Sequence, residues 1–156
     1  MMVVRLVRTG GALPPVLPLP GSGANTEVTA SGHVGDVEVA AGNRRVTAPS
    51  ADDVTLSAGT AAAVFSGPVG RVELLEGNTS VRAEVADRVL VTTANASFKA
   101  DRAAVVTVRG ANDAVRLVRL PRLKVVGPNN LAVVKKGSTK VTVRGANNRI
   151  RVNKRA

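Results

Sequence analysis

The chain of 156 residues contains no cysteine, no tryptophan, no tyrosine and a single histidine, His33. A disulfide framework, a thiolate zinc site and a cysteine nucleophile are therefore excluded, and one histidine cannot build a multi-histidine metal centre. The two aromatic residues, Phe65 and Phe98, are too few to anchor a core, so burial must come from valine, alanine and leucine. These absences exclude most enzyme chemistry. The chain is about as long as one ordinary domain.

Long hydrophobic runs are also missing. Arg5 and Arg8 precede a partly apolar stretch, as in a secretory signal peptide, but four prolines interrupt that stretch and favour extended backbone. No segment approaches the roughly 18–20 apolar residues of a membrane span. We expect no signal peptide and no membrane span, and we predict an extended, proline-rich N-terminal arm over 1–24, followed by a folded domain over 25–156. The arm is a candidate assembly element with a short strand at its tip, and its candidate residues are Val3, Val4, Leu6, Val7, Pro14, Pro15, Pro18 and Pro20.

Negative charge is scarce in the last third of the chain. Residues 101–156 carry 14 Lys and Arg against only Asp101 and Asp113, whereas residues 1–100 carry eight Lys and Arg against nine acidic residues. The formal net charge of +11 therefore comes entirely from the C-terminal third, and one end of the folded domain is expected to be strongly basic.

An internal repeat is the strongest feature that is present. VTVRGAN occurs at 106–112 and again at 141–147, and half of that interval is visible in a column of turn residues at 17- or 18-residue spacing: Asn25, Asn43, Thr60, Asn78, Asn95, Asn112, Asn129 and Asn147. Each turn residue after the first is preceded, six and four positions upstream, by two aliphatic residues. Asparagine suits this column because it tolerates a left-handed backbone, and its amide could also bond along a stack.

Alternation by two around each turn indicates strands rather than helices. Positions three and five after each turn residue form a second inward pair, and a looser third side includes Val34, Val69, Val85, Ala103 and Leu120. A unit of 17–18 residues cannot bury its own apolar face, but stacked coils can pair every strand with the coils above and below. We therefore predict an all-β fold: a single-stranded parallel β-helix, or β-solenoid, of about seven coils.

The spacing V-x-V-x-G-x-N-N-x-I-x-V at 141–152 is similar to a family of short-repeat β-helix domains of unknown function that is common in actinobacterial proteins. The proline-rich arm before a valine-rich solenoid containing SGHVGDVEV also resembles the bactofilins, bacterial cytoskeletal proteins that polymerise through stacked β-helices. Both resemblances imply a right-handed β-helix.

Catalytic constellations are weak in this sequence. His33 lies at an expected turn, where Asp36 is the only nearby partner that could orient it as a general base, and a solvated turn histidine is the favoured interpretation. Asp52 and Asp53 are expected to lie at a turn before the strand at Val54. The acidic residues do not repeat as in a calcium-binding β-roll, and Gly21-Ser22-Gly23 lacks the residues of a phosphate-binding loop. We expect a non-enzymatic protein without a metal or cofactor.

The basic residues of the C-terminal coils are a stronger candidate for a functional site. Four cations lie four positions after a turn asparagine and should point outward on one face, two more lie three positions before one, and others add to the same end. This candidate anionic-partner face comprises Arg82, Lys99, Arg109, Arg116, Arg119, Arg122, Lys124, Lys135, Lys136, Lys140, Arg144 and Arg151. Such charges protect an open sheet edge and aid solubility, or they bind an acidic protein surface, a polyanionic cell-wall polymer or nucleic acid. Nucleic acid is the weakest of these partners because no aromatic platform is available for base stacking.

The sequence thus predicts a structural or assembly protein, a β-helical peg that forms a homo-oligomer, with a trimer favoured. A phage virion accessory role, in capsid decoration, the minor capsid or the tail, is the first hypothesis, and it rests on analogy of fold. A bactofilin-like cytoskeletal scaffold and a module that binds an anionic polymer are the alternatives. The expected location is the virion for a phage-encoded chain and the cytoplasm otherwise.

Overall fold

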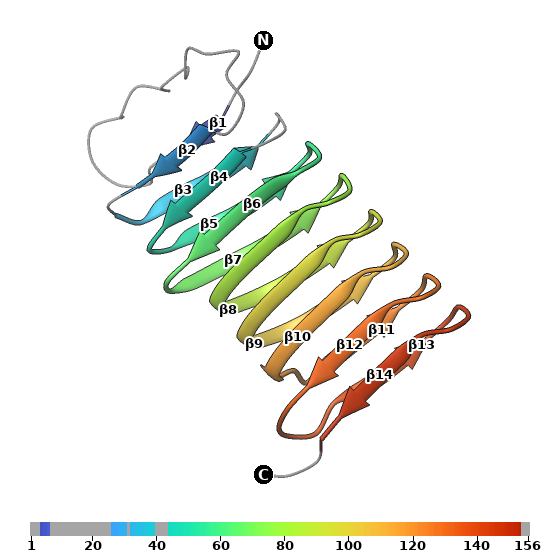
Figure 1. Cartoon of the computed structure of the whole chain (residues 1–156). Helices are drawn as coiled ribbons and strands as arrows, with labels where there is room; N and C mark the ends of the chain where they lie inside the picture. The colour runs from blue at the N-terminus through green and yellow to red at the C-terminus, as the bar shows by residue number, and fades with distance from the viewer. Residues whose placement is uncertain (1–3, 7–25, 31, 40–43, 154–156) are drawn as a thin grey trace.

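The chain folds as a β-solenoid of about seven coils, as the repeat predicts. The computed structural model describes residues 4–6, 26–30, 32–39 and 44–153, and these contain strands and turns with no helix. Figure 1 shows the coils stacked one upon the next, from β2 at one end to β13 and β14 at the other. Apart from β1, the strands pair in parallel, each with the equivalent strands of the neighbouring coils.

Each coil contributes one strand to each of two faces. We call sheet 1 the strands that follow the turn asparagines: β2 (Thr26–Thr29), β4 (Arg44–Ala48), β6 (Ala61–Phe65), the first part of β8 (Ser80–Val91), the first part of β9 (Ser97–Val108), β10 (Ala114–Arg119), β12 (Leu131–Val134) and β14 (Arg149–Val152). Sheet 2 contains β3 (Val34–Val39), β5 (Ala51–Leu56), β7 (Pro68–Leu74), the last parts of β8 and β9, β11 (Arg122–Val125) and β13 (Lys140–Val143). Because β8 and β9 run through both faces, the hydrogen bonds form one continuous 14-stranded network.

The core lies between the two sheets and is filled by the inward pairs that the alternation predicts. On sheet 2 the valine and leucine pairs from Val37 to Val125 are at most 2% exposed, and on sheet 1 the pairs from Val46 to Val134 are buried as well. The final sheet 2 pair differs, since Val141 is 37% and Val143 is 42% exposed. This pair is in register with the buried Leu123 and Val125, so its inward position is confirmed, but the described residues contain no further coil to cover it.

The third side, between the end of sheet 1 and the start of sheet 2, has one inward column. That column contains Val34, Ala51, Val69, Ala86, Ala103 and Leu120, all buried. Val85, which the sequence places on this side, does not belong to the inward column. Val85 is only half-buried and pairs with Arg102 in the outer column, whereas Ala86 occupies the core.

The turn column has the left-handed backbone expected of it. Thr60, Asn78, Asn95, Asn112, Asn129 and Asn147 have φ between 57° and 62°, a region that asparagine tolerates better than most residues. Their side chains are exposed. Asn25 and Asn43 lie outside the described residues.

The strand at the tip of the N-terminal arm folds back on the first coil. β1 (Val4–Leu6) pairs antiparallel with β3, with Val4 opposite Val39 and Leu6 opposite Val37. This strand covers the outer edge of sheet 2, the edge at which an exposed β-strand would otherwise present unpaired backbone groups. The other arm residues of interest, Val3, Val7, Pro14, Pro15, Pro18 and Pro20, lie outside the described residues.

Candidate anion-binding surface

Three cations form a continuous ladder on the outside of sheet 1. Parallel pairing sets Arg82 opposite Lys99 and Lys99 opposite Arg116, and all three side chains are exposed. The ladder is interrupted at the next coil by Val133 and resumes at Arg151. The sequence spacing therefore placed these four residues correctly in one outward column. Cations opposite each other on neighbouring strands repel, and an anion that bridged them would relieve that repulsion.

The remaining basic residues of the predicted face are exposed, but they do not share this column. Arg122, Lys124 and Lys140 lie on the outside of sheet 2, where Arg122 pairs with Lys140. Arg109 and Arg144 lie just after sheet 2 strands, while Arg119, Lys135 and Lys136 lie at the end of sheet 1 and on the third side. The twelve residues thus surround the C-terminal half of the rod, because outward positions on every side of the solenoid bring charge to the surface.

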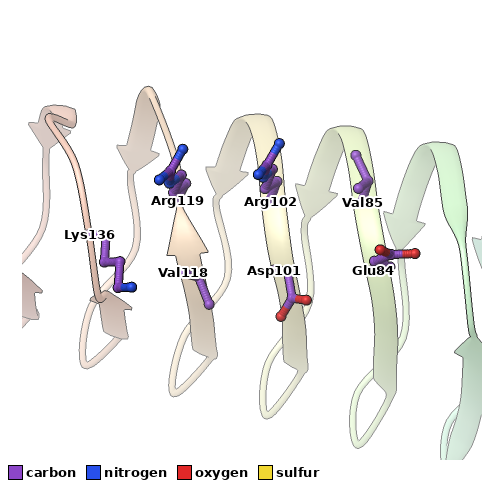
Figure 2. Close-up of a pocket in the computed structure, with 7 residues that line it drawn as sticks. All are labelled: Glu84, Val85, Asp101, Arg102, Val118, Arg119 and Lys136. Carbon is purple, nitrogen blue, oxygen red and sulfur yellow. The ribbon is translucent and has the colours of Figure 1, made fainter. Parts of the chain in front are cut away.

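The third side carries a groove that the sequence interpretation did not single out. Figure 2 shows that Arg102 and Arg119 project from adjacent coils in the same direction, with Lys136 on the coil beyond and Glu84 and Asp101 beside them. Arg102 and Arg119 are directly paired in the register of β9 and β10. Arg102 was missed because the third side lacks the regular alternation that identified the sheets.

A buried polar ladder runs along the stack beside the turn column, at the position immediately after each turn residue. The Ala96 amide donates to Asp113 Oδ1 at 2.8 Å, the Asp113 amide to Asn130 Oδ1 at 2.9 Å, and the Asn130 amide to Asn148 Oδ1 at 2.9 Å. Asn130 Nδ2 also donates to the Gly110 carbonyl at 3.0 Å. This column thus makes bonds along the stack of the kind that the sequence suggested for the turn asparagines, whose side chains are exposed.

Asp113 is the one titratable member of this ladder, and its pKa is strongly shifted. Burial raises the pKa of Asp113 to about 6, and the hydrogen bond from the Ala96 amide only partly opposes that rise. Asp113 Oδ2 has no hydrogen-bond partner. A Cβ atom built on Gly110 would meet both this oxygen and the Thr93 carbonyl oxygen, so two acceptors face the same point. That arrangement favours the protonated carboxyl, which can donate to the Thr93 carbonyl.

The surroundings of His33 differ from those the sequence suggested. Its partners come from the next coil rather than from Asp36: Nδ1 lies 2.7 Å from Ser50 Oγ, and Nε2 lies 3.3 Å from Asp52 Oδ1. The histidine and aspartate side chains are 43% and 55% exposed, so water screens both contacts and they contribute little to stability. Asp52 and Asp53 are part of β5 rather than a turn, and both are exposed where that strand bends from the third side into sheet 2.

Over the described ranges, no group of three or more His, Asp or Glu side chains is arranged to hold a metal ion. The described part of the chain also has no helix of the length and apolar character that crossing a membrane requires. Comparison of the sequence with protein-family models and curated proteins, and of the structure with solved structures, finds no match.

Proposed function

We propose that this chain is a non-enzymatic structural protein, a rigid β-solenoid peg that acts as an assembly component, and specifically a virion accessory protein of the capsid or tail. The observation that supports the proposal most directly is the uninterrupted coil register. The same inward columns repeat from Val37 to Val125 on sheet 2 and bury a single continuous core. A stack of this kind has a fixed length and presents its outward side chains at regular intervals, which suits a connector between fixed surfaces.

We further propose that the protein is a homotrimer and that its N-terminal arm contributes to assembly. Light scattering after size exclusion at moderate salt tests this. A closed species of three chains is expected for the full chain, and deletion of residues 1–24 is expected to abolish it while the strand signal in circular dichroism remains. A monomer would overturn the oligomer, and survival of the trimer after deletion would overturn the role of the arm. Open-ended, concentration-dependent mass would instead favour the bactofilin-like scaffold.

A second candidate function is the binding of an anionic polymer, and the in-register column of Arg82, Lys99 and Arg116 favours it. These side chains are exposed, and the ion pairs among the described residues, His33–Asp52 and Arg71–Glu73, involve none of them. Heparin immobilised on a column or sensor is a suitable probe. Its affinity should fall steeply as salt rises from about 0.05 to 0.2 M, because binding releases counterions from the polyanion. A flat salt response would contradict this function.

A further inference from the structure

The groove on the third side spans four successive coils and has a volume of about 470 Å³. Along it, one cation comes from each of three coils: Arg102 on β9, Arg119 at the end of β10, and Lys136 just after β12. The Lys136 amide donates to the Val118 carbonyl at 2.8 Å, which fixes that residue one coil beyond Arg119. A second hollow, lined by Gly137 and Ser138, shares Arg119 and Lys136 with the first and extends the groove toward the C-terminal coils.

We call these three residues the groove cations, and their backbone positions are separated by the spacing of the strands, about 4.8 Å per coil. All three are exposed, and neither ion pair found among the described residues includes one of them. Two guanidinium groups directly opposite each other on neighbouring strands are destabilising without a bridging anion. Arginine also offers a planar set of donors that matches a carboxylate, phosphate or sulfate. The groove is thus suited to a row of anionic groups.

Carboxylates occupy the other part of the groove. Glu84 and Asp101 hold equivalent positions on β8 and β9, and Figure 2 shows Asp101 next to Arg102 on its strand and Glu84 next to Val85 on the adjacent coil. Both are exposed and can only accept hydrogen bonds when ionised. A ligand that complements the whole groove must therefore carry anionic groups for the cations and neutral donors, such as hydroxyls, for Glu84 and Asp101.

We infer that this groove binds an acidic polysaccharide whose chain runs along the axis of the solenoid. Its anionic groups contact Arg102, Arg119 and Lys136, and its hydroxyl groups donate to Glu84 and Asp101. A nucleic acid strand fits less well, because its phosphates would meet the two carboxylates and no aromatic side chain lines the groove to stack on bases. This inference rests on the second candidate function, the binding of an anionic polymer, and it places the ligand on the third side rather than on sheet 1.

Titration of the full-length protein with oligogalacturonate of defined length, by calorimetry at low salt, tests the inference. Three sugar units suffice to follow the groove cations, which span two coil spacings, about 10 Å. The groove variant Arg102→Ser/Arg119→Ser should bind at least about tenfold more weakly than the unmodified protein, since it loses two charge-assisted contacts. The matched control is Arg71→Ser/Arg88→Ser, which removes two directly paired, exposed arginines from sheet 2 and should change the affinity by less than about threefold.

A second variant distinguishes specific recognition from simple attraction of charge. Removal of both carboxylates in Glu84→Ala/Asp101→Ala makes the groove more positive, so a purely electrostatic site would bind every polyanion more tightly. An acidic polysaccharide should instead bind more weakly, because its hydroxyls lose their acceptors, while single-stranded DNA should bind more tightly. Circular dichroism checks that each variant is folded, which is expected because all of these side chains are exposed.

The unfavourable outcomes are separable. Equal weakening by the groove variant and the Arg71→Ser/Arg88→Ser control would refute the groove while leaving the binding of anionic polymers intact. A failure of the unmodified protein to bind either oligogalacturonate or heparin, with retained binding of single-stranded DNA, would refute the acidic polysaccharide alone. A failure to bind any of the three polyanions would refute both the inference and the second candidate function.

Discussion

Replacing Asp113 by asparagine should stabilise the protein at neutral pH and remove one component of its pH dependence. The carboxyl is 2% exposed, its Oδ1 accepts from the Ala96 amide, and its Oδ2 faces the Thr93 carbonyl without a donor between them. One coil further on, the equivalent carbonyl, that of Gly110, does have a donor, because Asn130 Nδ2 donates a hydrogen bond to it. An asparagine at 113 keeps the Oδ1 acceptor and adds the corresponding donor toward Thr93.

The expected magnitude follows from the titration of the carboxyl. Burial raises the pKa of Asp113 from 3.8 to about 6, and this difference corresponds to about 3 kcal/mol of unfolding free energy. Below the lower value the group is protonated in both folded and unfolded states, so ionisation costs nothing. Between the two values the unfolded chain releases a proton that the folded chain retains, and stability falls as pH rises. Above about pH 6 the folded protein bears the full free-energy cost of holding an ionised carboxylate at Asp113.

Urea unfolding of the unmodified protein and of Asp113→Asn between pH 4 and pH 8 measures this directly. The difference in unfolding free energy between the two proteins should grow by about 2.4 kcal/mol from pH 4 to pH 7, in favour of the variant, because pH 4 already lies just above the lower pKa. The general repulsion of a basic chain largely cancels in that difference. Asp87→Asn, which removes an exposed carboxyl on β8, is the matched control and should keep the pH dependence of the unmodified protein. A pH-independent difference for Asp113→Asn would refute the reasoning.

Three further predictions concern the stability of the coils and are measured by urea unfolding. Phe98→Ala should cost about 3–5 kcal/mol because Phe98 is 1% exposed, whereas Lys99→Ala, on the outer side of the same strand, should change stability by less than about 0.5 kcal/mol. Asn95→Val should cost about 1–2 kcal/mol because φ is 62°, while Asn95→Gly should be nearly neutral; equal losses would contradict the role of the left-handed turn. Gly110→Ala should cost at least about 3 kcal/mol because its Cβ would overlap a backbone carbonyl oxygen of the neighbouring coil. Gly59→Ala, whose Cβ would make an ordinary 3.4 Å contact, should be tolerated.

The repeat was predictable because the number of residues in one coil of the structure is also the spacing at which residue types recur in the sequence. Each coil must return the chain to the same lateral position, so any residue with a fixed structural role recurs every 17 or 18 positions. The left-handed turn shows this most clearly, since even Thr60, the one residue of the described column that is not asparagine, adopts a φ of 59°. The position of Thr60 within the repeat therefore predicted its left-handed backbone conformation better than its residue type did.

The third side was predicted less well because coil length varies there. Coils of 17 and 18 residues keep the same sheet register, so the extra residue is absorbed outside the regular strands. The inward column shows the consequence, since Ala51 pairs with Val69, 18 residues later, whereas Val69 pairs with Ala86, 17 residues later. The inward residue of the β8 coil is accordingly Ala86 rather than its larger apolar neighbour Val85, so side-chain size does not identify this column. The same irregularity concealed Arg102, which lies in the adjoining outer column.

The buried polar ladder could be found only in three dimensions, because no single residue type marks its column in the sequence: Thr79, Ala96, Asp113, Asn130 and Asn148. Three of its polar members share one role, since each offers a side-chain oxygen to a backbone amide of the preceding coil. A carboxylate and an amide accept this bond equally well, and they differ only in the second polar atom, which lies against a carbonyl. Asparagine at 130 satisfies that carbonyl, while aspartate at 113 does so only when protonated. Asp113 and Asn130 thus occupy equivalent positions on neighbouring coils, and a proton on the Asp113 carboxyl takes the place of the amide hydrogen that Asn130 always carries.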